Sequence, residues 1–136
     1  MIEPVLRLPD WEARLAQVIE DSRLPLDYGQ FDCAIWAARC VKAVWGVDFA
    51  SQYVGRYSAI AGGLRLARAK SLSTLVSDRM RPVAPFLAHR GAIGLWQADK
   101  ANQGLCVKDG AFWLAPMAGT LAPVEAGFIT RSWTLD

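Results

Sequence analysis

Histidine and paired cysteines are scarce in this sequence. It has one histidine, His89, and three cysteines, and it contains no Cys-x-x-Cys pair. A structural zinc site needs about four Cys or His ligands, and a catalytic one needs about three protein ligands. A disulfide between Cys33 and Cys40 is also excluded if both lie on one helix, because seven helical residues span about 10 Å. We therefore predict neither a metal site nor a cofactor.

Excess charge of one sign and long apolar runs are missing as well. Fifteen Lys and Arg residues against 13 Asp and Glu residues leave a net charge of +2, and the basic residues form no block. This balance argues against nucleic acid or an anionic membrane as a partner. No run approaches the roughly 20 apolar residues of a membrane span. The start, MIEPVLRLPDWEARL, carries acidic residues where a secretory signal is basic, so we expect synthesis in a cytoplasm without signal-directed export.

The composition is that of a globular chain, with 53% hydrophobic and 21% charged residues. A length of 136 residues fits a single domain, 1–136. The apolar segment 33–45, between the capping residue Asp32 and the stop residue Gly46, predicts a buried central helix. Further helices are predicted from Trp11 onward with Asp10 as N-cap, at 59–70, and at 72–80 with Ser71 as N-cap.

The second half of the chain has a different character. The stretches AIGLW, GLCVKD, AFWLAP and GFITRSWTL are short, apolar or alternating, and turn residues separate them, which indicates strands. Asp109-Gly110 predicts a tight hairpin at 108–111. Helices followed by strands predict an α+β fold, in which the 33–45 helix packs on a small C-terminal antiparallel sheet.

Cys33 is the residue with the strongest chemical potential. It lies at the predicted N-terminus of an apolar helix, where unsatisfied N–H groups stabilise a thiolate. A nucleophilic thiol also needs a base within hydrogen-bond reach and a group that orients the base. The alternative is that Cys33 fills space in the core, as most cysteines do, and that Asp32 is simply an N-cap.

The stretch DYGQFDC with its apolar helix, followed by RGAIGLW and NQGLCVKDGAFWLAP, resembles the NlpC-type cell-wall cysteine peptidases. This papain-like superfamily places an Asp-Cys pair at the head of a buried helix and a His-Val-Gly strand opening nearby. The resemblance covers residues from about 11 to 116 and implies a papain-like, NlpC-like fold. The corresponding positions are Tyr28, Gly29, Asp32, Cys33, Gly91, Gly104, Gly110 and Pro116.

The departures from this family concern the catalytic helpers. With Gly104 on the family's glycine, the catalytic histidine position is held by Asn102, and the orienting polar position is held by Leu114. A neutral amide cannot take a proton from a thiol near pH 7, and leucine cannot orient a base. His89 is the one remaining candidate base, and it lies about a dozen residues upstream, in a loop. We therefore expect a pseudoenzyme in which Cys33 is vestigial.

Short members of this superfamily without the histidine resemble proteins of bacteriophage tail tips. This resemblance implies a structural virion component that is assembled in the bacterial host cytoplasm and binds other tail proteins. One alternative is an active peptidoglycan-cleaving cysteine endopeptidase or amidase that uses Cys33 during phage DNA entry. Another is an intracellular papain-like effector or amidase.

The six tryptophans suggest where partners bind. Trp96, Trp113 and Trp133 recur in predicted strands, where a core or a protein interface is favoured over a sugar-stacking platform. The C-terminal stretch EAGFITRSWTLD lies beyond the peptidase-like pattern. We predict that it forms part of the partner contact, with Phe128 and Trp133 as anchors.

Overall fold

The computed structural model describes residues 2–22, 27–117 and 120–136. Within them the chain forms four α-helices and one six-stranded sheet, which is the predicted α+β arrangement. The helices are α1 (Trp11–Asp21), α2 (Cys33–Trp45), α3 (Ile60–Leu66) and α4 (Leu72–Ser77), and two short 3₁₀ turns are η1 (Pro85–Leu87) and η2 (Ala126–Phe128). The strands are β1 (Arg81–Val83), β2 (Ile93–Gln97), β3 (Gln103–Asp109), β4 (Phe112–Met117), β5 (Thr120–Val124) and β6 (Ile129–Thr134).

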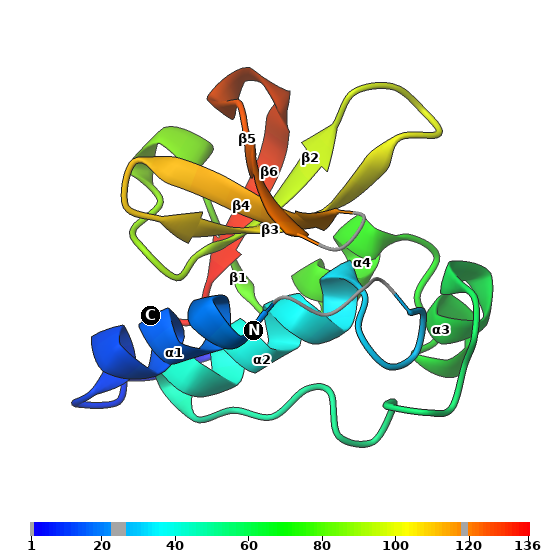
Figure 1. The fold of residues 1–136 in the computed structure, drawn as a ribbon, viewed down its shortest axis with the longest axis horizontal. Helices are drawn as coiled ribbons and strands as arrows, with labels where there is room; N and C mark the ends of the chain where they lie inside the picture. Colours follow the sequence, from blue (N-terminus) through cyan, green and yellow to red (C-terminus); the bar gives the residue numbers. More distant parts are fainter. Residues whose placement is uncertain (1, 23–26, 118–119) are drawn as a thin grey trace.

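The sheet has the strand order β1-β6-β2-β3-β4-β5, and every pairing between its strands is antiparallel. The helices lie together on one side of it, with α2 nearest its centre (Figure 1). Leu105 and Val107 of β3 join the main core beneath the sheet, together with the buried face of α2. The predicted central position of the cysteine-bearing helix is confirmed.

Helix α2 begins and ends where the sequence predicts. The side chain of Asp32 accepts a hydrogen bond from the backbone N–H of Ile35, and Gly46 adopts the left-handed conformation (φ 76°) that ends many helices. Eight of the thirteen residues of α2 are buried. This burial exceeds what a single amphipathic stripe gives and fits a helix enclosed by other elements. The buried residues are Ile35, Trp36, Ala37, Cys40, Val41, Ala43, Val44 and Trp45.

Two tryptophans anchor the core. Trp36 is fully buried and donates from Nε1 to Ser22 Oγ at 2.7 Å. Trp133 is also fully buried and donates from Nε1 to Ser77 Oγ at 3.1 Å, which ties β6 to α4. A buried indole N–H usually finds an acceptor, and the two serines supply one for Trp36 and Trp133.

The predicted role of the C-terminal stretch needs correction. Strand β6 lies inside the sheet between β1 and β2, so residues 129–134 are part of the fold. Trp133 therefore cannot serve as an interface anchor, because none of its surface is exposed. Phe128, in η2 just before β6, is 43% exposed and remains available.

Smaller corrections concern turns and caps. The β3–β4 hairpin turns at Gly110 and Ala111, between the paired residues Asp109 and Phe112, one position later than the Asp-Gly signal predicts. Asp10 makes no capping hydrogen bond and instead pairs with Arg14 at 2.8 Å. Helix α3 ends at Leu66, short of the predicted 70.

None of the helices in the described residues combines the length and apolar character that crossing a membrane needs.

Candidate functional site

Cys33 is the first residue of α2 and lies where the helix head meets the sheet. It is half-buried, and its thiol lies near the backbone of Leu105 on β3. The apolar segment 33–45 and one face of β3 explain this placement, since Leu105 and Val107 share a core with α2 while Cys106, on the opposite face, belongs to a second cluster. The structure thus places the thiol at a helix N-terminus, as the sequence predicts.

The electrostatics of this position favour the neutral thiol. Burial raises the pKa of Cys33 to about 11, and the negative charge of Asp32 acts in the same direction, while the Leu105 backbone opposes them. Helix N-termini normally lower the pKa of a cysteine, but here desolvation outweighs that effect. With this pKa, roughly one thiol in ten thousand is ionised at pH 7. Cys33 is therefore not poised as a nucleophile.

The carboxylate of Asp32 is occupied by the fold. It is 1% exposed, and its Oδ1 accepts from the backbone N–H of Ile35 at 2.8 Å. Its Oδ2 accepts from the backbone N–H of Gly29 at 3.0 Å and from the hydroxyl of Tyr57 at 2.5 Å. Burial raises the pKa of Tyr57, and the hydrogen bond to Asp32 raises it further. A buried carboxylate needs such donors, so Asp32 has a structural task that explains its presence before Cys33.

Gly29 makes this arrangement possible. It has φ +89°, and a Cβ atom built there would lie 1.9 Å from the backbone oxygen of Tyr57. The backbone N–H of Gly55 donates to the carbonyl of Gly29 at 2.7 Å. Gly29 and Asp32 therefore hold the segment 55–57 against the head of α2. Tyr28, the other residue of this stretch that the resemblance singles out, is 47% exposed.

Asn102 does not engage the thiol. It is exposed, in the turn that precedes β3, and its Nδ2 donates to Asp99 Oδ2 at 2.8 Å. Its backbone N–H also donates to Asp99 Oδ1 at 2.9 Å. Both bonds are local, so Asn102 stabilises the turn between β2 and β3. Leu114, which the sequence resemblance puts at the orienting position of NlpC-type peptidases, is half-buried in β4 and packs against the main core.

His89 lies at the other end of α2 from Cys33. A Cβ atom on Gly91, two residues later, would lie 3.1 Å from Val44, near the C-terminus of α2. Eleven residues separate Val44 from Cys33, which is about 16 Å along a helix axis. His89 is also exposed. The structure does not bring the sole imidazole together with the thiol, so Cys33 has no imidazole base in this conformation.

Tyr57 is the member of this site that sequence reasoning missed. It lies 25 residues from Asp32, in a loop without a recognisable motif. The Gly62-Gly63 pair that follows is an indirect sign that Tyr57 is closely packed. A Cβ atom on Gly63 would lie 3.0 Å from the Tyr57 ring, so a larger residue would crowd it. Within the described ranges, no three His, Cys, Asp or Glu side chains cluster as metal ligands would.

Comparison with known proteins gives one positive result. Neither the search of curated proteins nor the search of solved structures finds a match. One family model, described as "Domain of unknown function (DUF6950)", matches residues 6–135, nearly the whole chain. The protein therefore belongs to the DUF6950 family.

Proposed function

We propose that this protein is a catalytically silent member of the papain-like, NlpC-like fold that serves as a structural component of a bacteriophage tail tip. It would be incorporated into the virion in the host cytoplasm and bind neighbouring tail proteins. The observation that carries this proposal is the position of Cys33, whose helix head lies about 16 Å from the end of α2 where the sole histidine lies. Burial, which raises the pKa of the Cys33 thiol, supports it.

The chemistry of thiol proteases explains why this state is inactive. A positioned general base contributes typically 10²–10⁴-fold to the rate, and the thiolate is the attacking species. Here the side-chain amide of Asn102 donates a hydrogen bond to Asp99. The carboxylate of Asp32 accepts hydrogen bonds from three donors. Neither side chain is free to take the proton of Cys33, so hydrolysis of peptidoglycan is not expected.

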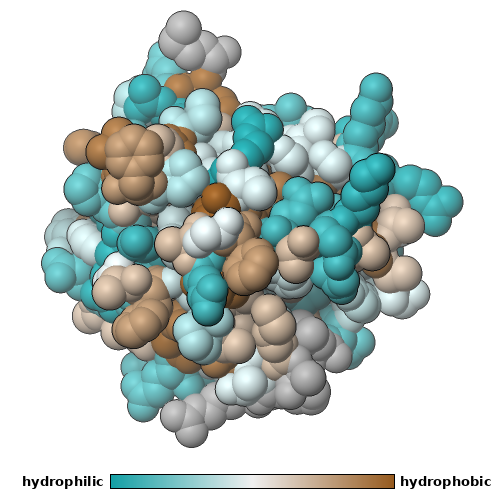
Figure 2. Space-filling model, turned by 90° about the horizontal axis from the view of Figure 1, so that it is seen from above, coloured by the Kyte–Doolittle hydropathy of each residue, from teal (hydrophilic) through white to brown (hydrophobic). Residues whose placement is uncertain are grey.

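The surface supports a binding role. On the sheet side of the molecule, hydrophobic side chains form several separate patches among hydrophilic ones (Figure 2). Phe86 and Leu87 in η1 are 86% and 60% exposed, and Phe128 in η2 is 43% exposed. Turn η1 packs against β6, and η2 directly precedes β6, so both turns border this strand. We name Phe86, Leu87 and Phe128 the η1–η2 surface.

The η1–η2 surface has the character of an interface centre. Phenylalanine is enriched in the cores of protein interfaces, and large exposed apolar side chains that gather together mark interaction sites. A specific interface should bury at least about 1,000 Å² in total. The surface would supply the apolar anchor of such a contact.

Two measurements test the proposal. First, the purified protein is incubated with cell-wall sacculi, and released peptides are followed by mass spectrometry. We expect no release above that of the Cys33→Ala variant. Digestion that disappears in Cys33→Ala would overturn the pseudoenzyme assignment and favour the peptidase alternative.

Second, intact particles from the native host are isolated and assayed for the protein. We expect it to copurify with tails and to be lost when Phe128→Ser and Phe86→Ser are combined. Leu6→Ser is a matched control, because Leu6 is 90% exposed and precedes the helices. Recovery only as a free monomer, with no association with particles, would refute the structural role.

A further inference from the structure

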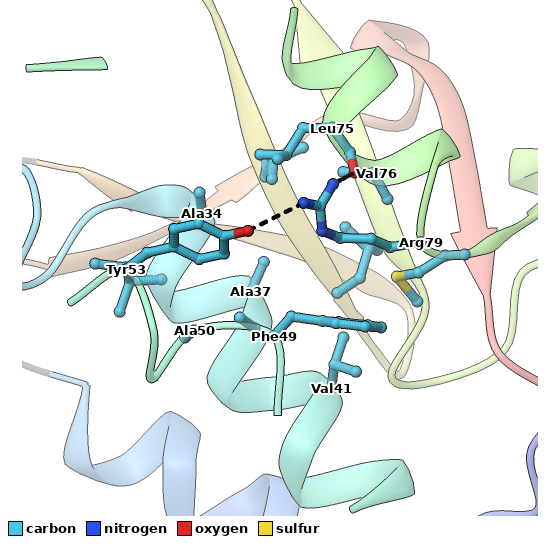
Figure 3. A pocket seen from close by; sticks show the side chains of 14 residues that line it. Ala34, Ala37, Val41, Phe49, Ala50, Tyr53, Leu75, Val76 and Arg79 are labelled. Carbon is cyan, nitrogen blue, oxygen red and sulfur yellow. Dashed lines mark hydrogen bonds between the residues drawn. The ribbon is translucent and has the colours of Figure 1, made fainter. Parts of the chain in front are cut away.

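A pocket lies beside α2, next to the Cys33 site, because Ala34, Ile35 and Leu105 are among the residues that line it. Its walls come from α2, the segment 49–53, α4 and the two central strands β2 and β3, and its cavity volume is about 80 Å³. The lining is almost entirely apolar (Figure 3). The pocket exists because α2 presents Ala34, Ala37 and Ala38 there, whose side chains leave the space between α2 and α4 unfilled.

One cation lines this apolar pocket. Arg79 follows α4 and is half-buried, and Figure 3 shows it pointing toward Tyr53 across the pocket. Its Nη1 donates to the carbonyl of Leu75 at 2.8 Å, and its Nη2 donates to the hydroxyl of Tyr53 at 3.4 Å. Among the described residues, no carboxylate lies within salt-bridge distance of this guanidinium.

The guanidinium of Arg79 can donate more hydrogen bonds than these two. A guanidinium carries five N–H donors in a planar fork that matches a carboxylate. Two of them have partners here, and both partners are uncharged. A half-buried cation next to an apolar cavity therefore lacks the anion that would balance its charge. The polar rim reaches solvent, because Arg79 and Tyr53 are only half-buried.

We propose that this pocket binds an aliphatic carboxylate, with the carboxylate on Arg79 and Tyr53 and the aliphatic part in the cavity. The volume sets the size of that part. An apolar cavity of about 150 Å³ holds benzene, so one of 80 Å³ holds roughly three or four carbon atoms by proportion. Such a group is found at the C-terminus of a peptide that ends in Val or Leu, and in a short branched fatty acid. This proposal does not depend on the inactivity of Cys33 or on a tail-tip location.

The test compares matched ligands on the wild-type protein. Methyl NMR shifts are recorded while 3-methylbutanoate, its neutral amide and the corresponding amine are titrated. We expect the carboxylate to shift the methyl groups of Leu75, Val76 and Val41 and to bind about tenfold more tightly than the amide, as a charge-assisted hydrogen bond predicts. The methyl groups of Leu6, which is exposed and does not line the pocket, should stay unchanged. Equal binding of the acid and the amide, or no shift at the pocket methyl groups, would overturn the proposal.

A second titration distinguishes the two classes of ligand that carry such a carboxylate, a peptide C-terminus and a short branched fatty acid. Acetyl-Gly-Gly-Leu with a free C-terminus is compared with its C-terminal amide and with the free acid. Binding of the peptide acid at least tenfold tighter than 3-methylbutanoate would assign the pocket to a protein C-terminus. Equal affinities would assign it to a small acid, and both results support carboxylate recognition.

Variants then test the residue that is assigned the charge. Arg79→Gln should abolish the preference for acid over amide, whereas Arg79→Lys should keep part of it. Arg65→Gln is the matched control, because Arg65 is exposed on α3 and does not line the pocket. Thermal unfolding of each variant checks that α4 survives loss of the bond to Leu75. A preference that persists in folded Arg79→Gln would contradict the assignment.

Discussion

The hydroxyl of Tyr57 donates a hydrogen bond of 2.5 Å to Oδ2 of Asp32, the residue that caps the helix carrying Cys33. The two residues are 25 positions apart, and the carboxylate is 1% exposed. The head of α2 is thus fixed by a loop that comes after the helix. Because the carboxylate of Asp32 accepts hydrogen bonds from Gly29, Ile35 and Tyr57, a structural role is sufficient to explain the acid next to Cys33.

Removing the Tyr57 hydroxyl should destabilise the protein. Tyr57→Phe leaves a buried carboxylate oxygen with one donor fewer, and an unsatisfied buried polar group costs about 1–3 kcal/mol. We expect the free energy of unfolding, measured in urea, to fall by that amount. Tyr28→Phe is the control, because Tyr28 is 47% exposed, and its change should stay within about 0.5 kcal/mol. Equal effects of the two substitutions would show that the Asp32 contact contributes nothing.

The pKa of Cys33 predicts how the thiol reacts. With a value of about 11, caused mainly by burial, the thiolate fraction should increase about tenfold for each pH unit between 7 and 10. We expect alkylation of the folded protein by iodoacetamide, followed by mass spectrometry, to show this rise. An activated nucleophile, with a pKa of about 3.5–7.5, would change its rate by at most about fourfold over the same range.

Two other cysteines provide the internal check on that experiment. Cys40 and Cys106 are fully buried, and burial raises the pKa of both thiols. They should remain unmodified while the protein stays folded. A rate for Cys33 that is already at its plateau at pH 7 would revive the peptidase alternative.

The raised thiol pKa values also predict loss of stability at alkaline pH. Above pH 9, the unfolded chain releases the proton of Cys33, whereas the folded chain keeps it until about pH 11. The folded state binds more protons there, so its stability falls as the pH rises, by up to about 1.4 kcal/mol per unit for each such thiol. We expect the free energy of unfolding to be constant from pH 7 to 8 and to decline above about 8.5. In Cys33→Ala the decline should be shallower, and an unchanged slope would contradict the assigned pKa.

Much of the fold could be predicted from local signals. The caps of α2, Asp32 and Gly46, are confirmed because both act within a few residues of the helix ends. The capping side chain of Ser71 is confirmed as well, accepting from the N–H of Thr74 at 3.1 Å. The antiparallel sheet is confirmed because alternating stretches separated by turn residues have few other arrangements.

The elements that were missed depend on contacts between distant residues. Strands β1 and β5 contain Pro82 and Pro123, which argue against strands in a sequence, yet both strands lie at the edges of the sheet, where proline is tolerated. The burial of Trp133 follows from the insertion of β6 between β1 and β2, which no local pattern indicates. At the candidate site, the thiol position was predictable, but its partner network was not, because Tyr57 is brought in by a loop.

Gly29 and Gly110 offer a matched test of the helix-head arrangement. Both have positive φ values, +89° and +61°, so an alanine at either position adopts a left-handed conformation that costs roughly 1–2 kcal/mol. They differ in space, because a Cβ atom on Gly29 would lie 1.9 Å from the Tyr57 carbonyl oxygen, whereas one on Gly110 meets nothing within 4 Å. We expect Gly110→Ala to lower the free energy of unfolding by about that conformational cost alone.

Gly29→Ala should cost more, by at least about 2 kcal/mol beyond Gly110→Ala, because the backbone at 55–57 must move and the Tyr57–Asp32 hydrogen bond is disturbed with it. Urea unfolding measures both variants, and the double variant Gly29→Ala with Tyr57→Phe separates the two contributions. If the glycine acts through the hydroxyl contact, the double variant should be less unstable than the sum of the single changes. Strict additivity, or equal costs at Gly29 and Gly110, would show that the helix head does not rely on the close approach of these two segments.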